Sequence, residues 1–524
     1  MTRRFCKRMP ALAGLLSLLL TVTVCAAAIT AVVSQSTTLL AQGVQYQYED
    51  VETGDGPQKI HTVSFSLAEE LVGMRAALPN GHVKGTQKVI DMAKAADEDD
   101  TVIAAINGGY FSGSTVHGLM ITDGELYNSP PVTNSPLNPW EAVALAVDKN
   151  NQPFMDDTPA FSATYTIGEE TVAFQHINRV RAAGNADNLV DSFVLYTDWY
   201  AASTGTDNTG GLEVSLQVED DTIRHGTSMT GKVVAINPEG NSPLEPGVVV
   251  LSATALAKAP LEKLKLGDTV QLDFAFEDAR WADVTFAIGG GRILVKDGEI
   301  QQLPDNSLHN NRNPRTAVGI KPDGTVVWMT VDGRQSGVSA GVRATTLAQL
   351  LIDKGCTWVI NLDGGGSTTM AVKMPGEELA VRNVPSNAGA EERRVANGIL
   401  LVLKDKEAAL PTTTTTTTVP TTTTTTAAPT TTTVPPTVTT TTAPTTTTTT
   451  TTVPPATTTT VSPSTTQAAT TVVEPTVTGV QGQPITEDSP AVRWWSGVVL
   501  GAAALLIAGG IFLLLWKRGT LPGP

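Results

Sequence analysis

The chain has 524 residues, of which 41% are hydrophobic and only 16% are charged. Its formal net charge of −16 argues against nucleic-acid binding, because nucleic-acid-binding proteins present basic surfaces to the phosphate backbone. Cys6 and Cys25 fall in the first segment, which we expect to be removed, so Cys356 is left alone and no disulfide framework is expected.

Residues 1–41 are expected to form a secretory signal peptide. A basic start is followed by an uncharged, mostly apolar run over 11–33 and then by small residues. Cleavage after Ala41 and cleavage at the alanines 26–28 are both compatible with this pattern. The apolar run is also long enough to span a membrane, so an uncleaved anchor stays open as an alternative.

Residues 42–406 are expected to form one strand-rich, mixed α/β globular domain, large enough to contain two subdomains. Apolar runs bounded by turn residues predict strands, in chain order at 61–67, 101–106, 142–147, 247–251 and 326–331. Apolar residues at helical spacing predict helices over 87–96 and 345–354, the second ending before Gly355.

Three apolar strands, predicted at 102–107, 284–288 and 359–363, each end in a glycine turn. These turns contain Gly108-Gly109, then 289–291, then 364–366. Consecutive glycines cost conformational entropy on folding, so they are rarely present for stability alone. They allow backbone N–H groups to point together at an anion or a polar ligand. We expect the three loops to meet at one edge of a sheet, where ligand sites commonly form.

The composition changes abruptly towards the C-terminus. Residues 407–484 are rich in Thr and Pro and are expected to form a disordered, extended stalk. A juxtamembrane segment, 485–495, precedes an uncharged run over 496–516 that is long enough for a transmembrane helix. Lys517-Arg518 then place the tail, 517–524, in the cytoplasm. We therefore expect a single-pass membrane protein whose globular domain is extracellular.

Two carboxylates and several arginines could carry chemistry. Asp332 and Asp363 each end an apolar run, where a carboxylate can serve as nucleophile, base or acid. Arginines can bind phosphate with two parallel hydrogen bonds. Each residue also has a structural alternative: both aspartates could close turns, and Arg315 could form a structural salt bridge. The six histidines lack the spacing of metal ligands, so no metal or cofactor is expected.

Five short motifs occur in an order that resembles the phosphodiester glycosidase family, which includes N-acetylglucosamine-1-phosphodiester α-N-acetylglucosaminidases. The motifs are Ile106-Asn-Gly-Gly-Tyr-Phe111, Arg315-Thr-Ala-Val-Gly319, Val331-Asp-Gly-Arg334, Asn361-Leu-Asp-Gly-Gly-Gly-Ser367 and Glu392-Arg-Arg-Val-Ala-Asn397. The resemblance covers about residues 44–404. The disulfide-rich setting of the animal enzyme is absent here, so its mannose-6-phosphate substrate is not carried over.

The resemblance implies a glycosidase that hydrolyses a sugar-1-phosphodiester at its anomeric carbon, acting on a cell-surface or exopolysaccharide glycan. It implies that Asp363 and Asp332 are the catalytic carboxylates, without assigning their separate roles. The substrate-binding residues that it implies are Asn107, Arg315, Asn361, Gly364, Gly365 and Ser367, with Arg343 or Arg393 as further phosphate ligands. The rival hypothesis is a non-catalytic, stalked surface module that binds an anionic cell-wall polymer.

Overall fold

The structure, a computed structural model, describes residues 27–404 apart from 69, 98–100, 132–142, 158, 175, 183, 186, 187, 190 and 208. All described residues belong to one compact unit. The predicted stalk, membrane span and cytoplasmic tail lie outside the described residues, as does most of the predicted signal peptide. In the part of the chain that is described, no helix is both long and apolar enough to cross a bilayer.

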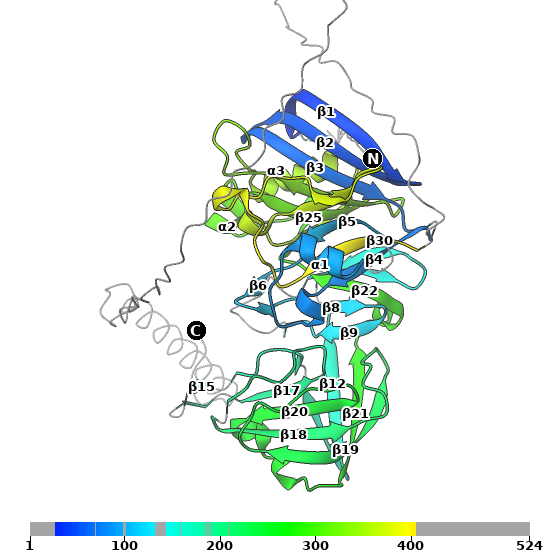
Figure 1. The fold of residues 1–524 in the computed structure, drawn as a ribbon, viewed down its shortest axis with the longest axis vertical. Coiled ribbons are helices and arrows are strands. Elements are labelled where there is room, and N and C mark those ends of the chain that lie inside the picture. The colour runs from blue at the N-terminus through cyan, green and yellow to red at the C-terminus, as the bar shows by residue number, and fades with distance from the viewer. Residues whose placement is uncertain are drawn as a thin grey trace, which may run out of the picture. The chain divides into compact units, whose positions relative to one another are not determined.

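The first sheet has eight antiparallel strands, and Figure 1 shows β1, β2 and β3 side by side in it. In spatial order the strands are β1 (Ile29–Ala41), β2 (Val44–Thr53), β3 (Gly56–Phe65), β26 (Val326–Val331), β25 (Arg315–Ile320), β27 (Trp358–Asn361), β23 (Arg292–Lys296) and β24 (Glu299–Ile300). One face of this sheet packs against helix α3 (Ala344–Asp353), and the short helix α2 (Ser307–Asn310) lies beside α3.

Two five-stranded antiparallel sheets follow. The second sheet is ordered β29 (Leu379–Val381), β28 (Met370–Lys373), β5 (Val102–Asn107), β30 (Gly398–Leu403) and β4 (Val72–Ala77), with helix α1 (Val89–Ala95) packed on it. The third sheet is ordered β11 (Pro153–Asp156), β10 (Ala144–Asp148), β22 (Val284–Gly289), β8 (Met120–Thr122) and β9 (Glu125–Asn128).

The fourth sheet has eight strands and holds a core of its own. Its order is β13 (Glu170–Phe174), β12 (Phe161–Ile167), β21 (Thr269–Phe276), β19 (Ser228–Asn237), β18 (Gly211–Gln217), β20 (Val248–Thr254), β17 (Ser192–Tyr196) and β14 (His176–Ile177). Two short pairs complete the strands, β6 (Phe111–Ser112) with β7 (Thr115–Val116) and β15 (Gly184–Asn185) with β16 (Asn188–Leu189).

The third sheet contributes to two large apolar cores at once. Along β10, Leu145 and Val147 belong to the core shared with the first and second sheets. Ala144 and Ala146 belong to the core of the fourth sheet. Successive side chains of a strand point to opposite faces, so this sheet is buried on both sides. The predicted strand-rich mixed fold is confirmed, and the two predicted helices are found as α1 and α3.

A strand precedes residue 42, which was the predicted start of the domain. Residues 29–41 form β1, which pairs with β2 from Ile29 opposite Thr53 to Ala41 opposite Val44. Leu40 is completely buried and Ala41 nearly so. The segment was assigned to the signal peptide because its start is apolar, yet its Val, Thr and Ser residues are equally suited to a strand. Cleavage after Ala41 would remove β1, whereas cleavage at the alanines 26–28 would preserve it.

The presence of β1 predicts different stabilities for two soluble fragments. A fragment of residues 27–406 should unfold cooperatively. A fragment of residues 42–406 should lose at least about 2 kcal/mol, because it lacks the burial of Leu40 and leaves β2 without its neighbour. Urea denaturation of both fragments, followed by tryptophan fluorescence, measures the difference. Equal midpoints would show that β1 contributes nothing to the fold.

Candidate functional site

The three glycine turns lie against one another, as the sequence predicts. They do not meet at one edge of a sheet, because β5, β22 and β27, which lead into them, belong to three different sheets. The backbone N–H of Asp363 donates to the carbonyl of Gly108 at 3.1 Å. A Cβ atom on Gly109 would collide with the carbonyl oxygen of Gly289, so the first and second turns touch through their backbones. Only glycine permits this approach. We call residues 363–369, which follow β27, the central loop.

Asn107, at the end of β5, fixes the central loop. Its side-chain oxygen accepts hydrogen bonds from the Thr316 hydroxyl at 2.7 Å and from the Thr369 N–H at 3.1 Å. Its amide nitrogen donates to the carbonyl of Asp363 at 2.7 Å. The side chain is 0% exposed. The structure therefore places Asn107 behind the loop, as a positioning residue, rather than at the surface where a sugar would bind.

Asp363 is the partly exposed carboxylate of the site. Its Oδ1 atom accepts a hydrogen bond from the N–H of Gly364 at 2.8 Å. Burial raises the pKa of Asp363, and the Ser367 hydroxyl, the Gly364 N–H and the charges of Arg393 and His117 oppose that shift. The carboxylate thus faces cations and a hydroxyl on an accessible loop. His117 was not among the predicted site residues, and nothing in its sequence setting indicates its place beside Asp363.

Asp332, directly after β26, is buried to 1% exposure. Both of its oxygens accept from the N–H of Val384, at 3.0 and 3.2 Å, and the amide of Asn383 donates to it at 3.2 Å. Asn383 in turn donates to the carbonyl of Thr368 and accepts from the N–H of Met370. Asp332 therefore supports the central loop from the interior.

A buried histidine and tyrosine extend inward from Asp332. His61 Nε2 lies 3.9 Å from Asp332 Oδ2, and His61 Nδ1 shares a 2.8 Å hydrogen bond with the Tyr46 hydroxyl. Burial lowers the pKa of His61 to about 4 and raises the pKa of Asp332 to about 6, in each case because the charged form loses its hydration. The neutral forms of His61 and Asp332 are therefore both more favoured at this site than they would be in water.

Arg315 is held by backbone carbonyls. Its Nε atom donates to the carbonyl of Val342 at 3.0 Å, and its Nη2 atom donates to those of Leu308 and Asn311 at 2.8 and 2.9 Å. The side chain is 5% exposed. These bonds tie α2 to the segment before α3, and they occupy donors that a phosphate would otherwise use.

Arg343 is paired with Asp55 at the N-terminus of α3. Its Nη1 atom lies 2.6 Å from Asp55 Oδ1, and its backbone N–H donates to Oδ2 at 3.0 Å. The hydroxyl of Thr346 also donates to Oδ2, at 2.6 Å. A carboxylate at a helix N-terminus is favourable, so this arrangement stabilises α3. The charge of Arg343 is already paired with Asp55 and is less available to a phosphate.

Two other arginines lie against the glycines of the central loop. A Cβ atom on Gly365 would lie 2.9 Å from Arg334 Nη2, and one on Gly366 would collide with Arg393 Nη2. Arg393 also donates to the Ser367 hydroxyl at 3.4 Å. Sequence reasoning named Arg393 but missed Arg334. The closeness of Arg334 to Asp332 in the sequence could have indicated that Arg334 belongs to the site. The left-handed backbone of Arg334, at φ 62°, was not evident from the sequence.

The residues on either side of Arg393 hold it in place. Glu392 accepts a hydrogen bond from the N–H of Ile90 in the first turn of α1, at 3.1 Å. Arg394 donates to the carbonyl of Thr86 at 2.5 Å. Because both neighbours are bound to the segment that begins α1, Arg393 is directed towards the central loop.

The two arginines against the central loop, Arg334 and Arg393, form no ion pair with the described residues, although the charge of Arg393 acts on Asp363. Both arginine side chains are exposed, in a protein whose formal net charge is −16. Two adjacent guanidinium groups without carboxylate partners favour an anionic ligand such as phosphate.

Several buried oxygens of the loop also lack partners. In the described part of the chain no hydrogen bond reaches Asn361 Oδ1, Thr368 Oγ1 or Thr369 Oγ1. Asn361 is 5% exposed, and its amide nitrogen donates to the Tyr110 hydroxyl at 3.0 Å. Buried polar atoms are rarely left unpaired, so these oxygens are candidates to accept hydrogen bonds from a ligand or a water.

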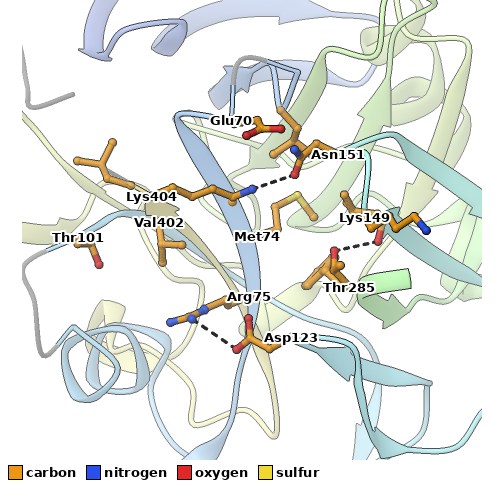
Figure 2. A pocket seen from close by; sticks show the side chains of 15 residues that line it. Glu70, Met74, Arg75, Thr101, Asp123, Lys149, Asn151, Thr285, Val402 and Lys404 are labelled. Atoms are coloured by element: carbon orange, nitrogen blue, oxygen red, sulfur yellow. Dashed lines mark hydrogen bonds and ion pairs between the residues drawn. The ribbon is translucent and has the colours of Figure 1, made fainter. Parts of the chain in front are cut away.

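A sizeable cavity lies elsewhere in the described residues. It has a volume of about 700 Å³ and contains none of the predicted site residues. Figure 2 shows two of its cations already facing partners: Arg75 lies 3.4 Å from Asp123, and Lys404 donates to Asn151 at 2.9 Å. Its wall residue Thr285 is near the start of β22 and Gly289 is at the end, roughly 13 Å apart along the strand. Charge and polar atoms therefore assign the candidate site to the central loop.

Part of the chain matches a known family. Residues 221–402 match the phosphodiester glycosidase family. The family segment includes Arg334, Asp363 and Arg393, and it confirms the resemblance that the motifs predict. Asn107 lies outside it, although its hydrogen bonds join the central loop.

The proteins that are similar to the chain include one curated relative and two solved structures. The SPbeta prophage-derived uncharacterized protein YomE of Bacillus subtilis is 45% identical over 273 residues, which cover 49% of this chain and 41% of the relative. A hypothetical protein from Synechocystis has a TM-score of 0.54 at 18% identity, covering 69% of this chain and 62% of that one. A putative exported protein from Burkholderia pseudomallei has a TM-score of 0.52 at 21% identity, covering 66% of this chain and 74% of that one. The two structures show a shared fold. The chain spans less than half of its curated relative, so the activity of the whole protein is a matter for proposal.

The buried histidine predicts a specific pH dependence of stability. Between its unfolded pKa of 6.5 and its folded pKa of about 4, the unfolded chain binds more protons at His61, so acidification favours unfolding. Asp332 acts in the opposite direction between 3.8 and about 6, because its folded form binds more protons. Acidification should therefore lower the free energy of unfolding less in His61→Gln than in the wild type, by up to about 3 kcal/mol.

Urea midpoints at pH 7 and pH 4.5 measure this slope. The absolute stability of His61→Gln should fall, because the bond to Tyr46 is disturbed, but the loss on acidification should be smaller than in the wild type. His82→Gln controls for the removal of a histidine. Parallel pH curves for wild type and His61→Gln would contradict the expected burial effect.

Proposed function

We propose that this protein is a phosphodiester glycosidase that hydrolyses sugar-1-phosphodiesters. One observation carries the proposal. The accessible carboxylate of Asp363 belongs to the same loop that Arg334 and Arg393 lie against, and neither arginine has an ion-pair partner among the described residues. The family match over residues 221–402 supports the same reaction class.

In the proposed reaction, the bond between the anomeric carbon and the phosphate oxygen breaks. Water supplies the oxygen that replaces it, and the phosphate leaves as a monoester. The leaving group is acidic, so stabilisation of its charge matters more than proton donation. Arg334 and Arg393 bind the phosphate, which favours departure of the electron pair with the leaving oxygen. Asp363 stabilises the positive charge that develops at the anomeric carbon, or activates the attacking water.

The remaining predicted residues have supporting roles in this proposal. Asp332 and Asn107 are positioning residues, because both are buried and bonded to the loop or to its neighbours. Gly364 and Gly365 allow the loop to approach Pro314, whose carbonyl accepts from the N–H of Gly365 at 2.9 Å. Asn361 remains a candidate sugar ligand through its unpaired oxygen.

We further propose that the enzyme acts on a cell-surface or exopolysaccharide glycan. The support is the sequence pattern alone: a basic and apolar N-terminal segment, a Thr/Pro-rich stalk over 407–484 and an apolar run over 496–516. In this proposal the domain is extracellular, and the stalk separates it from the membrane.

The role of Asp363 can be tested by Asp363→Asn. An amide keeps the shape of the side chain and can still accept from Gly364, but it lacks the negative charge. Turnover of a sugar-1-phosphodiester should fall about a hundredfold or more, with little change in melting temperature. The matched control is Asp323→Asn, which alters a surface aspartate that likewise accepts a backbone N–H in a turn.

The rival hypothesis makes the opposite prediction. A non-catalytic module that binds an anionic cell-wall polymer would keep the arginines but would not depend on a charged Asp363. Turnover within a fewfold of wild type in Asp363→Asn would exclude this carboxylate from the chemical step. A lowered melting temperature with normal turnover would assign Asp363 to the turn alone.

The arginine site can be tested without changing an arginine. In Gly366→Ala the new methyl group would occupy the position of Arg393 Nη2 and Asn387 Oδ1. Both are ends of flexible side chains, so the fold should persist while Arg393 is displaced. We expect kcat/KM to fall at least about tenfold, because a charge-assisted phosphate contact is weakened. Gly54→Ala is the control, since a Cβ there meets nothing within 4 Å. Equal kcat/KM in both variants would separate Arg393 from substrate binding.

A further inference from the structure

A groove shares the side chain of Arg334 with the central loop. It has a volume of about 440 Å³, and its lining includes Asp55, Pro57, Arg312, Arg334, Gln335 and Ser336. Arg334 belongs to both places, because its guanidinium lies against Gly365 and its side chain forms part of the groove wall. The groove is therefore continuous with the proposed phosphate site.

The acidic residue of this lining does not offset its arginines. Asp55 is 2% exposed. Its two carboxylate oxygens are already bound to Arg343 and to the hydroxyl of Thr346. The charges that remain available to a ligand in the groove are those of Arg312 and Arg334.

Arg312 is anchored but not neutralised. Its Nη1 atom donates to the carbonyl oxygen of Asp55 at 3.1 Å, which orients the guanidinium. It has no ion-pair partner among the described residues. A guanidinium has five N–H donors in a planar fork, so most of its hydrogen-bonding capacity is open to an anion. Arg393, Arg334 and Arg312 thus form a series of unpaired cations that leads from the central loop into the groove.

We propose that this groove is a subsite for the aglycone and that Arg312 binds a second phosphate of the same substrate. The inference rests on the proposed function and narrows its substrate class to glycans whose units are joined by repeated phosphodiesters. A substrate with a single phosphodiester would occupy Arg334 and Arg393 and would leave Arg312 without a counter-charge. A repeating sugar-phosphate chain supplies a second anion on the aglycone side. Gln335 and Ser336 add polar groups that can contact its hydroxyls.

The test compares two synthetic substrates on the full chain. One is a sugar-1-phosphate methyl ester, which has a single phosphodiester, and the other is a short glycan with two consecutive sugar-1-phosphodiesters. In Arg312→Gln, the ratio of kcat/KM for the two-phosphate substrate to that for the one-phosphate substrate should fall at least about tenfold, as expected for loss of one charge-assisted contact. Arg280→Gln is the control, because Arg280 is an exposed arginine that pairs with Asp278.

Binding is measured separately from turnover, so that failure of the proposed reaction can be recognised. Calorimetry with the two-phosphate glycan should show at least about tenfold weaker binding to Arg312→Gln than to wild type, and the difference should shrink at high salt because ionic contacts are screened. That result would support the subsite even if neither substrate were hydrolysed. An unchanged ratio and unchanged affinity in Arg312→Gln would overturn it, as would a wild-type protein that binds the two-phosphate glycan no better than the methyl ester.

Discussion

The amide of Asn107 joins segments that are far apart in the sequence, and the site depends on it. Its oxygen accepts from Thr316 and Thr369, and its nitrogen donates to the carbonyl of Asp363. Only a side chain that both donates and accepts can make these bonds. An aspartate would lose the donor, and an apolar residue would leave buried partners unpaired at about 1–3 kcal/mol each. The chemistry of one side chain therefore sets where the second sheet, the first sheet and the central loop meet.

Once the loop is fixed, its glycines decide what can approach it. A Cβ on Gly364 would lie 2.8 Å from the carbonyl oxygen of Pro314, and one on Gly365 would lie 2.9 Å from Arg334. The glycines thus permit close packing as well as a sharp turn. They also keep the surface of the loop free of side chains, so that the arginines can lie directly over backbone. In a protein of net charge −16, distant charges are screened beyond about 8 Å at physiological salt, and these local cations would determine which anions bind.

Much of the framework could be predicted from the sequence, because it follows from local periodicity. The helix that ends before Gly355 was predicted by apolar spacing, and the meeting of the glycine turns was predicted from their positions after apolar runs. The partners of individual arginines could not be predicted. Arg315 lies in a motif as suggestive as that of Arg393, and Arg343 was predicted as a further phosphate ligand. Carbonyl groups of the segment around α2 accept hydrogen bonds from Arg315, and Arg343 forms an ion pair with Asp55. Such pairings depend on tertiary contacts between residues distant in the chain. Strand β1 was missed because an apolar segment near the N-terminus fits both a signal peptide and a strand.

The two aspartates show most clearly how packing separates residues with equivalent sequence patterns. Asp332 and Asp363 each follow an apolar strand and precede a glycine. Gly333 is covered by Pro314 and Gly341, so the chain closes over Asp332 and its carboxylate turns inward to Val384 and Asn383. Burial there raises its pKa to about 6, so at neutral pH the fold keeps a charged group where the charge is costly. The N–H of Val384 and the amide of Asn383 offset part of that cost. Asn383 also donates to the carbonyl of Thr368 in the central loop. The hydrogen bonds of the buried Asp332 carboxylate thus help to fix the loop on which the Asp363 carboxylate is accessible.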